Sequence, residues 1–232
     1  MDFGKAFTFM FDDPNWLRKL GIGTLVGLLG IVLMPILIGV IPLLMVVGYT
    51  LDALRNVAEG KEFPMPEWNE WGGFLIRGVK LVVAFFVWSL PLLLVGIPIG
   101  LGAVLAGNQS NAGPAIGALL MVCASCLAFL WGLFLLLITP AIYIRLAVTG
   151  RLGAAFQIGK LWALTRDNLG NVILALILMF VAGLIAAVVG SLGTLLLCVG
   201  FLITVPLATL WQYLVQAHLF GQIGRHSVTP IE

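Results

Sequence analysis

The stretch that decides the fold is residues 81–144, LVVAFFVWSLPLLLVGIPIGLGAVLAGNQSNAGPAIGALLMVCASCLAFLWGLFLLLITPAIYI, which contains no Asp, Glu, Lys, Arg or His. About 20 apolar residues cross the ~30 Å hydrocarbon layer of a bilayer, so this stretch is long enough for two spans. Residues 20–51 and 168–217 also lack these five residue types. Backbone polar groups in lipid must be satisfied within helices or closed barrels, and the alternating polarity of a barrel is absent. We therefore predict an all-α integral membrane protein.

The composition of the whole chain agrees with that prediction. Of 232 residues, 61% are hydrophobic and only 9% are charged, whereas a soluble domain carries about 25% charged residues. The net charge of +2 gives no nucleic-acid signal, because acidic neighbours offset most of the basic residues. Residues 1–13 include four charged side chains, so we expect no cleaved signal peptide there.

Turn-forming residues divide the three apolar stretches. Pro35, Gly39 and Pro42 lie in the middle of the first, a polar run at 107–114 divides the second, and a weaker break at 190–194 divides the third. We predict six hydrophobic segments in three hairpins, with later spans at 79–106, 114–144, 171–191 and 195–220. The first hairpin is short or re-entrant. As one helix, residues 20–51 would measure about 48 Å, so five transmembrane helices are the alternative.

The basic residues all lie outside the proposed hairpins. They form four groups: Lys5, Arg18 and Lys19; Arg55, Lys61, Arg77 and Lys80; Arg145, Arg151, Lys160 and Arg166; and Arg225. The positive-inside rule places all four groups, and with them both termini, in the cytoplasm. We predict one membrane domain, made of residues 1–60 with the first hairpin, 61–150 with the second, 151–226 with the third, and a tail at 227–232.

Aromatic residues precede each hairpin at helical spacing. We predict that they belong to amphipathic helices on the cytoplasmic surface, where aromatic rings favour the membrane interface. Asp13 is expected to cap a helix with Pro14 in its first position. The interfacial anchors predicted in this way are Phe3, Phe7, Trp16, Trp68, Trp71 and Trp162.

The charged and aromatic landmarks of the first third carry a family resemblance. The run 13–19, DPNWLRK, is followed by Gly48-Tyr49, then by Pro66-Glu67-Trp68, and then by Gly78 and Lys80. This pattern resembles the prokaryotic integral-membrane family catalogued as domain of unknown function 4013. The resemblance implies a multi-pass protein of the prokaryotic cytoplasmic membrane, and it brings no reaction or ligand.

Candidate chemistry is sparse. Cys123 and Cys126 have the CxxC spacing but lie in an apolar span without a βαβ context, so we expect packing residues. We predict no catalytic residue, no metal site and no cofactor, because no Ser, His and acid, and no ligand cluster, occur at suitable spacing. One polar intramembrane stripe on the last span is the exception, and it comprises Thr209, Gln212, Tyr213 and Gln216.

Two functions remain open on these grounds. The leading hypothesis is a non-catalytic scaffold, accessory or bilayer-organising protein that is not an enzyme, with membrane lipids as partners. Small-residue pairs such as Gly183 and Ala187 permit close helix contacts, which leaves a homo-oligomer or a membrane-protein partner open. The alternative is an uncoupled channel or carrier for a neutral or lipidic solute, in which the polar stripe lines a cavity. Coupled transport is disfavoured because no acid, base or histidine lies within the bilayer between the basic flanks of the spans.

Overall fold

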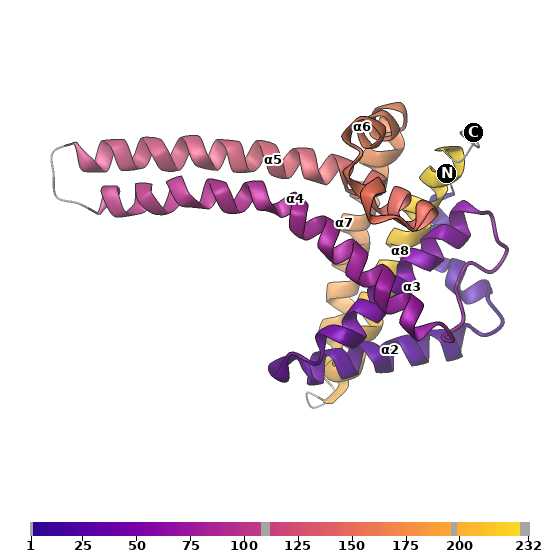
Figure 1. The fold of residues 1–232 in the computed structure, drawn as a ribbon. Coiled ribbons are helices and arrows are strands. Elements are labelled where there is room, and N and C mark those ends of the chain that lie inside the picture. The colour runs from indigo at the N-terminus through magenta and orange to yellow at the C-terminus, as the bar shows by residue number, and fades with distance from the viewer. Residues whose placement is uncertain (1, 108–111, 196–198, 228–232) are drawn as a thin grey trace. The chain divides into compact units, whose positions relative to one another are not determined.

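The computed structural model describes residues 2–107, 112–195 and 199–227, and every regular element in these ranges is a helix. This confirms the all-α prediction. In chain order the elements are α1 (Phe3–Thr8), η1 (Phe9–Asp12), α2 (Trp16–Val32), η2 (Met34–Ile36), α3 (Val40–Ala58), α4 (Trp71–Ala106), α5 (Gly113–Thr149), η3 (Leu152–Phe156), α6 (Ile158–Asp167), α7 (Leu169–Leu192), η4 (Gly193–Leu195) and α8 (Val199–Ser227) (Figure 1).

Five of the described helices are long and apolar enough to cross a membrane, namely α3, α4, α5, α7 and most of α8. A sixth apolar helix, α2, has 17 residues. At 1.5 Å per residue it measures about 25 Å, a little less than the hydrocarbon thickness.

The first apolar stretch is two helices and not one continuous helix, and α3 but not α2 is among the five helices long enough to span, so the five-span alternative stays open beside six. Between them, Met34–Ile36 form a 3₁₀ turn and Leu37 adopts a left-handed conformation with φ of 62°. Pro35 lies in this turn and Pro42 in the first turn of α3, where a missing backbone N–H breaks no intrahelical bond. The helices α2 and α3 contact each other.

The remaining breaks lie where the turn residues predict them. Helix α4 ends at Ala106 and α5 begins at Gly113, although residues 108–111 of the polar run are outside the described residues. At the ends away from this break both helices run further than predicted, since α4 already begins at Trp71 and α5 continues to Thr149. Arg77, within this extension of α4, forms an ion pair with Asp52 of α3, so a charge there does not interrupt the helix. Residues 228–232 of the predicted tail are also outside the described ranges.

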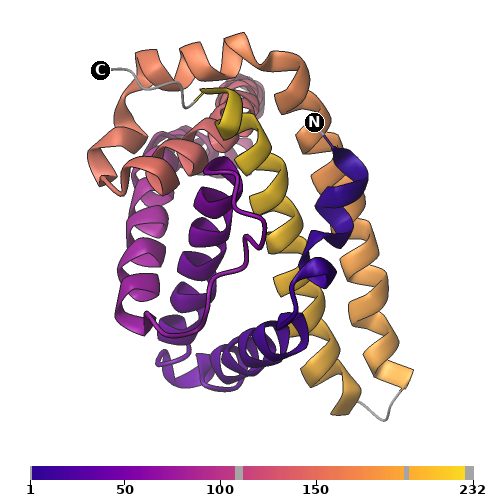
Figure 2. The ribbon, with the colours of Figure 1, turned by 90° about the vertical axis from the view of Figure 1, so that its right-hand side faces the viewer.

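The chain divides into two compact units, unit 1 (Met1–Val82 with Pro140–Glu232) and unit 2 (Val83–Thr139). Helix α8 is the centre of unit 1, where it contacts α1, α2, α3 and α7 (Figure 2). Its side chains Leu214, Val215, Phe220 and Ile223 are fully buried. This contact set explains why the C-terminal half of α8 is lined with apolar side chains on several faces.

Two glycines let α3 and the start of α4 approach backbone to backbone. A methyl group on Gly48 would overlap the carbonyl oxygen of Phe74, and one on Gly78 would overlap the carbonyl oxygen of Leu44. Larger side chains at either position would push the helices apart. The close approach places Phe74 against Tyr49, with ring centroids 5.6 Å apart.

Unit 2 consists of the remaining parts of α4 and α5, which lie side by side (Figure 1). The Trp131 indole N–H donates to the Trp88 carbonyl at 3.1 Å, and Phe134 packs against both rings. Other side chains of unit 2 are strongly exposed. Phe129, for example, is 70% exposed. Cys123 and Cys126 are also exposed free thiols, so the expectation that they are packed inside is wrong.

Candidate functional site

The start of the chain is held against α8 by reciprocal hydrogen bonds. The Asp2 backbone N–H donates to Gln222 Oε1 at 2.7 Å, and Gln222 Nε2 donates to the Asp2 carbonyl at 2.9 Å. The Phe9 ring stacks on His218 with centroids 4.5 Å apart, and the Trp211 indole N–H donates to the Phe7 carbonyl. These contacts bring the N-terminal segment to the C-terminal half of α8.

The bonding of Gln222 also determines the proton position on His218. Gln222 Nε2 lies 2.9 Å from His218 Nδ1, and an amide nitrogen carries only donors. Nδ1 must therefore accept, which assigns the proton of the neutral imidazole to Nε2. His218 is only 7% exposed, and no described residue bonds to its Nε2.

A polar cavity of about 480 Å³ lies beside this imidazole. Its volume is within the usual range for small-ligand sites. Part of its wall is apolar and consists of Phe9, Val57 and Pro64. The loop that follows α3 forms the rim of the cavity. Its charged and polar lining side chains are Asp2, Lys5, Lys61, Glu62, His218, Gln222 and Arg225.

Neighbouring contacts shape the rim of the cavity. Asn56 Nδ2 donates to the Pro64 carbonyl at 2.8 Å, and Lys61 bonds to both Asn56 and Glu59. The Arg225 guanidinium donates to the Val57 carbonyl in the last turn of α3, at 3.1 and 3.3 Å. A cation is favourable there because the carbonyls at a helix C-terminus carry partial negative charge.

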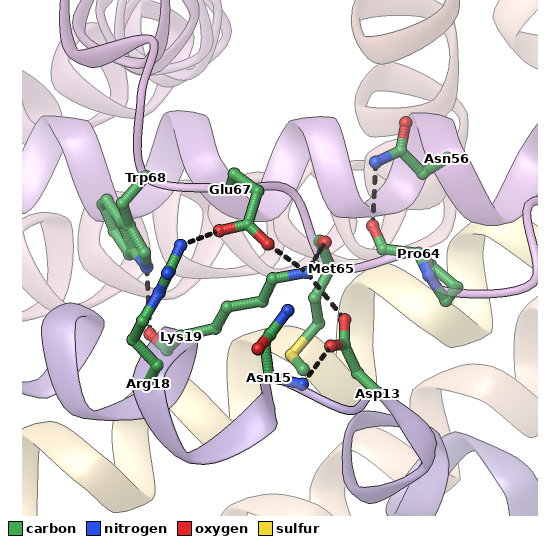
Figure 3. A network of polar contacts seen from close by, with 9 residues as sticks. All are labelled: Asp13, Asn15, Arg18, Lys19, Asn56, Pro64, Met65, Glu67 and Trp68. Atoms are coloured by element: carbon green, nitrogen blue, oxygen red, sulfur yellow. Dashed lines mark hydrogen bonds and ion pairs between the residues drawn. The ribbon is translucent and has the colours of Figure 1, made fainter.

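A buried ion pair joins the N-terminal segment to the loop before α4 (Figure 3). Lys19 Nζ lies 2.7 Å from Asp13 Oδ2 and donates to the Met65 carbonyl at 2.8 Å. Lys19 is 5% exposed and Asp13 3%. The Trp68 indole N–H donates to the Lys19 carbonyl at 2.9 Å. Lys19 therefore bonds both to Asp13 and to two residues of the loop before α4.

Glu67 adds a third charge at the exposed side of this pair. It lies 3.1 Å from Lys19 Nζ and 2.5 Å from the Arg18 guanidinium. Burial raises the pKa of Glu67, but hydrogen bonds and charges from Lys19 and Arg18 outweigh it, so the pKa is lowered overall. The ionised carboxylate is therefore the favoured form.

Asp13 does not cap a helix that begins at Pro14. Helix α2 begins two residues later, at Trp16. The Asn15 backbone N–H donates to Asp13 Oδ1 at 2.8 Å, and the other carboxylate oxygen binds Lys19. The prediction failed because both carboxylate oxygens of Asp13 are engaged in these two contacts, and α2 has no side-chain cap at Asn15.

Other charged segments are joined in the same manner. Arg77 of α4 pairs with Asp52 of α3 at 2.5 Å. Lys80 donates to the Gly150 carbonyl at 2.7 Å. Arg145, near the end of α5, donates to Gln157 before α6 at 2.7 Å. Together with the bonds of Asp2, Lys19 and Arg225, these contacts connect all four basic groups of the sequence within unit 1.

The six predicted anchors occupy different environments. Phe3, Phe7 and Trp16 are half-buried, whereas Trp71 and Trp162 are 40% and 46% exposed. Trp68 is an interior residue: its indole lies parallel to the Tyr49 ring, with centroids 4.1 Å apart. The structure thus brings Trp68 and Trp71 together, with ring centroids 5.4 Å apart.

The predicted polar stripe packs between helices rather than forming a described cavity. The Gln212 amide lies against Gly183 of α7, and Gln216, 9% exposed, shares a hydrogen bond with Tyr143 of α5. Tyr213 is 36% exposed and Thr209 half-buried. None of the four lines the polar cavity of about 480 Å³.

Comparison with known proteins supplies the family. The family model described as "Protein of unknown function (DUF4013)" matches residues 28–195. This chain belongs to the DUF4013 family. The DUF4013 match extends from α2 through α7, well beyond the first third that carries the resemblance, and it begins after the run 13–19. No curated protein and no solved structure matches the chain.

Sequence reasoning missed the cavity of this DUF4013 protein. His218 and Gln222 are one helical turn apart in the last apolar stretch, which is the signal that could have been followed. Lys5 and Glu62 carry no such signal, because only the fold brings their segments to α8. The cavity, rather than the polar stripe, is the candidate binding site.

Proposed function

We propose that this chain is a multi-pass protein of a prokaryotic cytoplasmic membrane, with both termini in the cytoplasm, and that it acts as a non-catalytic scaffold or accessory protein. The observation that carries the proposal is the direct bonding of the four charged segments to one another. The apolar helices α3 and α8 both end among these bonded segments, where Arg225 of α8 donates to the Val57 carbonyl of α3. One polar face above a set of apolar helices suits a protein that holds partners at a membrane surface.

The engagement of the acidic residues supports a non-catalytic role. Asp13, Glu59 and Glu67 lie in ion pairs with Lys or Arg. A general acid or base needs a carboxyl group free to exchange a proton near neutral pH. Burial raises the pKa of Glu59 and of Glu67, but hydrogen bonds and charges from the paired cations lower it overall, so these two carboxylates stay ionised and serve to join segments.

The packing of Gln212 and Gln216 disfavours the carrier alternative. A neutral solute needs polar groups along a continuous path, whereas these amides are in contact with α7 and α5. In vesicles reconstituted with the purified chain, we expect no faster permeation of small neutral solutes than in protein-free vesicles. Permeation that is lost on Gln216→Leu would replace the scaffold proposal with the carrier.

Cysteine labelling tests the orientation. In a background without native cysteines, Lys5→Cys should react with a membrane-impermeant maleimide only after the cells are opened. Ser191→Cys, near the turn after α7, should react in intact spheroplasts and provides the matched control. Labelling of residue 5 from outside would contradict the orientation.

The scaffold role is tested in native membranes. We expect the tagged chain to migrate on blue native gels in an assembly that contains another membrane protein, and gene deletion to shift that partner to a smaller species. A chain that migrates alone, with every other membrane complex unchanged after deletion, would refute the scaffold role. This outcome would leave the labelling result intact, so orientation and role are tested separately.

A further inference from the structure

Both cations and carboxylates line the 480 Å³ cavity. Among the described residues, four lining groups form no ion pair: the cations Lys5 and Arg225 and the carboxylates Asp2 and Glu62. A fifth lining charge, Lys61, lies 3.1 Å from Glu59, a carboxylate that also pairs with Arg55. Groups of both signs therefore line one cavity, and they complement a ligand that carries a negative and a positive charge better than a simple anion or a simple cation.

His218 adds a hydrogen-bond donor to this set. Its Nδ1 accepts from Gln222, so Nε2 carries the proton, and that N–H is without a protein partner among the described residues. The imidazole lines the cavity, so an acceptor oxygen of a ligand would satisfy it.

We propose that this cavity binds a phosphate group that carries a nearby primary ammonium, the chemistry of a phosphoethanolamine headgroup. Lys5, Arg225 and the His218 N–H bind the phosphate oxygens, and Asp2 and Glu62 bind the ammonium. The proposal rests on the proposed membrane location, which places the ends of α3 and α8 at the headgroup level of the cytoplasmic leaflet. The volume accommodates a headgroup but leaves the acyl chains outside.

Solvent exposure limits how much each charged residue contributes to headgroup binding. Lys5 and Glu62 are exposed, and ion pairs in such positions contribute about 0.2–1 kcal/mol. Loss of one of them should weaken headgroup binding about two- to fivefold. Both residues are on the surface, so their amide variants should fold normally.

The test uses the full chain, purified and delipidated in detergent, with three probes of identical acyl chains. Phosphatidylethanolamine, phosphatidylcholine and phosphatidylglycerol are supplied in equal amounts, and native mass spectrometry measures which stays bound. Phosphatidylcholine keeps the phosphate but has no N–H donors, and phosphatidylglycerol keeps the phosphate without the ammonium. We expect phosphatidylethanolamine to be retained over both.

Variants then assign the binding to the cavity. Lys5→Gln and Glu62→Gln should each lower retention of phosphatidylethanolamine by the stated factor, whereas Lys160→Gln, an exposed lysine of α6 that does not line the cavity, should leave it unchanged. Equal retention of the three lipids would overturn the proposal. Preference for phosphatidylglycerol that is insensitive to Glu62→Gln would also overturn it, by showing a simple anion site.

Soluble phosphoethanolamine distinguishes the two sources of this chemistry. Displacement of the lipid by the soluble compound would assign a free small molecule, and failure of displacement with the lipid still retained would assign the membrane lipid. The scaffold role is measured independently by native gels. A chain that assembles with a partner but shows no headgroup selectivity would therefore refute this inference alone.

Discussion

Replacing Lys19 with methionine removes a buried ammonium group while keeping most of its aliphatic length. Asp13 is 3% exposed, and the Lys19 ammonium 2.7 Å away is its cationic partner. The variant would leave that carboxylate buried without a countercharge. Breaking one side of a buried pair costs about 3–5 kcal/mol. For a chain of this size, that corresponds to a fall in Tm of roughly 6–20 °C.

Thermal unfolding in detergent, followed by tryptophan fluorescence, measures this effect. Trp68 is a local reporter because its indole donates to the Lys19 carbonyl and stacks on Tyr49. Lys160→Met is the matched control, because Lys160 is exposed on α6. Exposed substitutions usually change stability by less than about 0.5 kcal/mol.

A second substitution separates the charge from the shape. Asp13→Asn in the Lys19→Met background removes the uncompensated charge and keeps an oxygen for the Asn15 N–H. We expect the double variant to recover part of the lost Tm. If Lys19→Met matches the Lys160→Met control, or if Asp13→Asn lowers its Tm further, the buried ion pair does not join these segments as described.

Three further predictions concern unit 1. Gly48→Ala should destabilise the chain by about 1–3 kcal/mol or more, because the added methyl group overlaps the Phe74 carbonyl. The control is Gly21→Ala, whose methyl group meets no atom within 4 Å, and it should be neutral or stabilise α2 by up to about 1 kcal/mol. Equal Tm values for the two variants would contradict the close approach of α3 and α4. The lowered pKa of Glu67 means that its contribution to stability is present above its ordinary pKa of about 4.3 and is lost as pH falls through the folded-state value. Glu67→Gln should therefore flatten the acid side of a Tm-against-pH curve, and an unchanged acid side would count against the pairing with Lys19. Lys80→Met should lower the free energy of unfolding by about 1.5 kcal/mol, because it removes a charged donor from the Gly150 carbonyl. The same fluorescence melt measures this effect, and an unaltered Tm would contradict the prediction.

The sequence by itself determined the helical class, the family resemblance and the positions of the breaks. Long runs without charge predict helices because a buried backbone must satisfy its own hydrogen bonds, and Pro35, Gly39 and the polar run at 107–114 mark turns through local backbone preferences. These are properties of neighbouring residues, so they can be inferred before any fold is known. The division of the first apolar stretch into α2 and α3 belongs to this group.

Tertiary structure alone decided which side chains meet. Lys19 and Glu67 are 48 residues apart in numbering, and Asp2 and Gln222 are separated by 220; no periodicity or composition connects such pairs. Trp68, predicted as an interfacial anchor, lies in a ring stack because Gly48 and Gly78 draw α3 and α4 together. The cavity likewise depends on the tertiary fold. Its charges come from three segments that only the packing of α1 and α3 against α8 brings together.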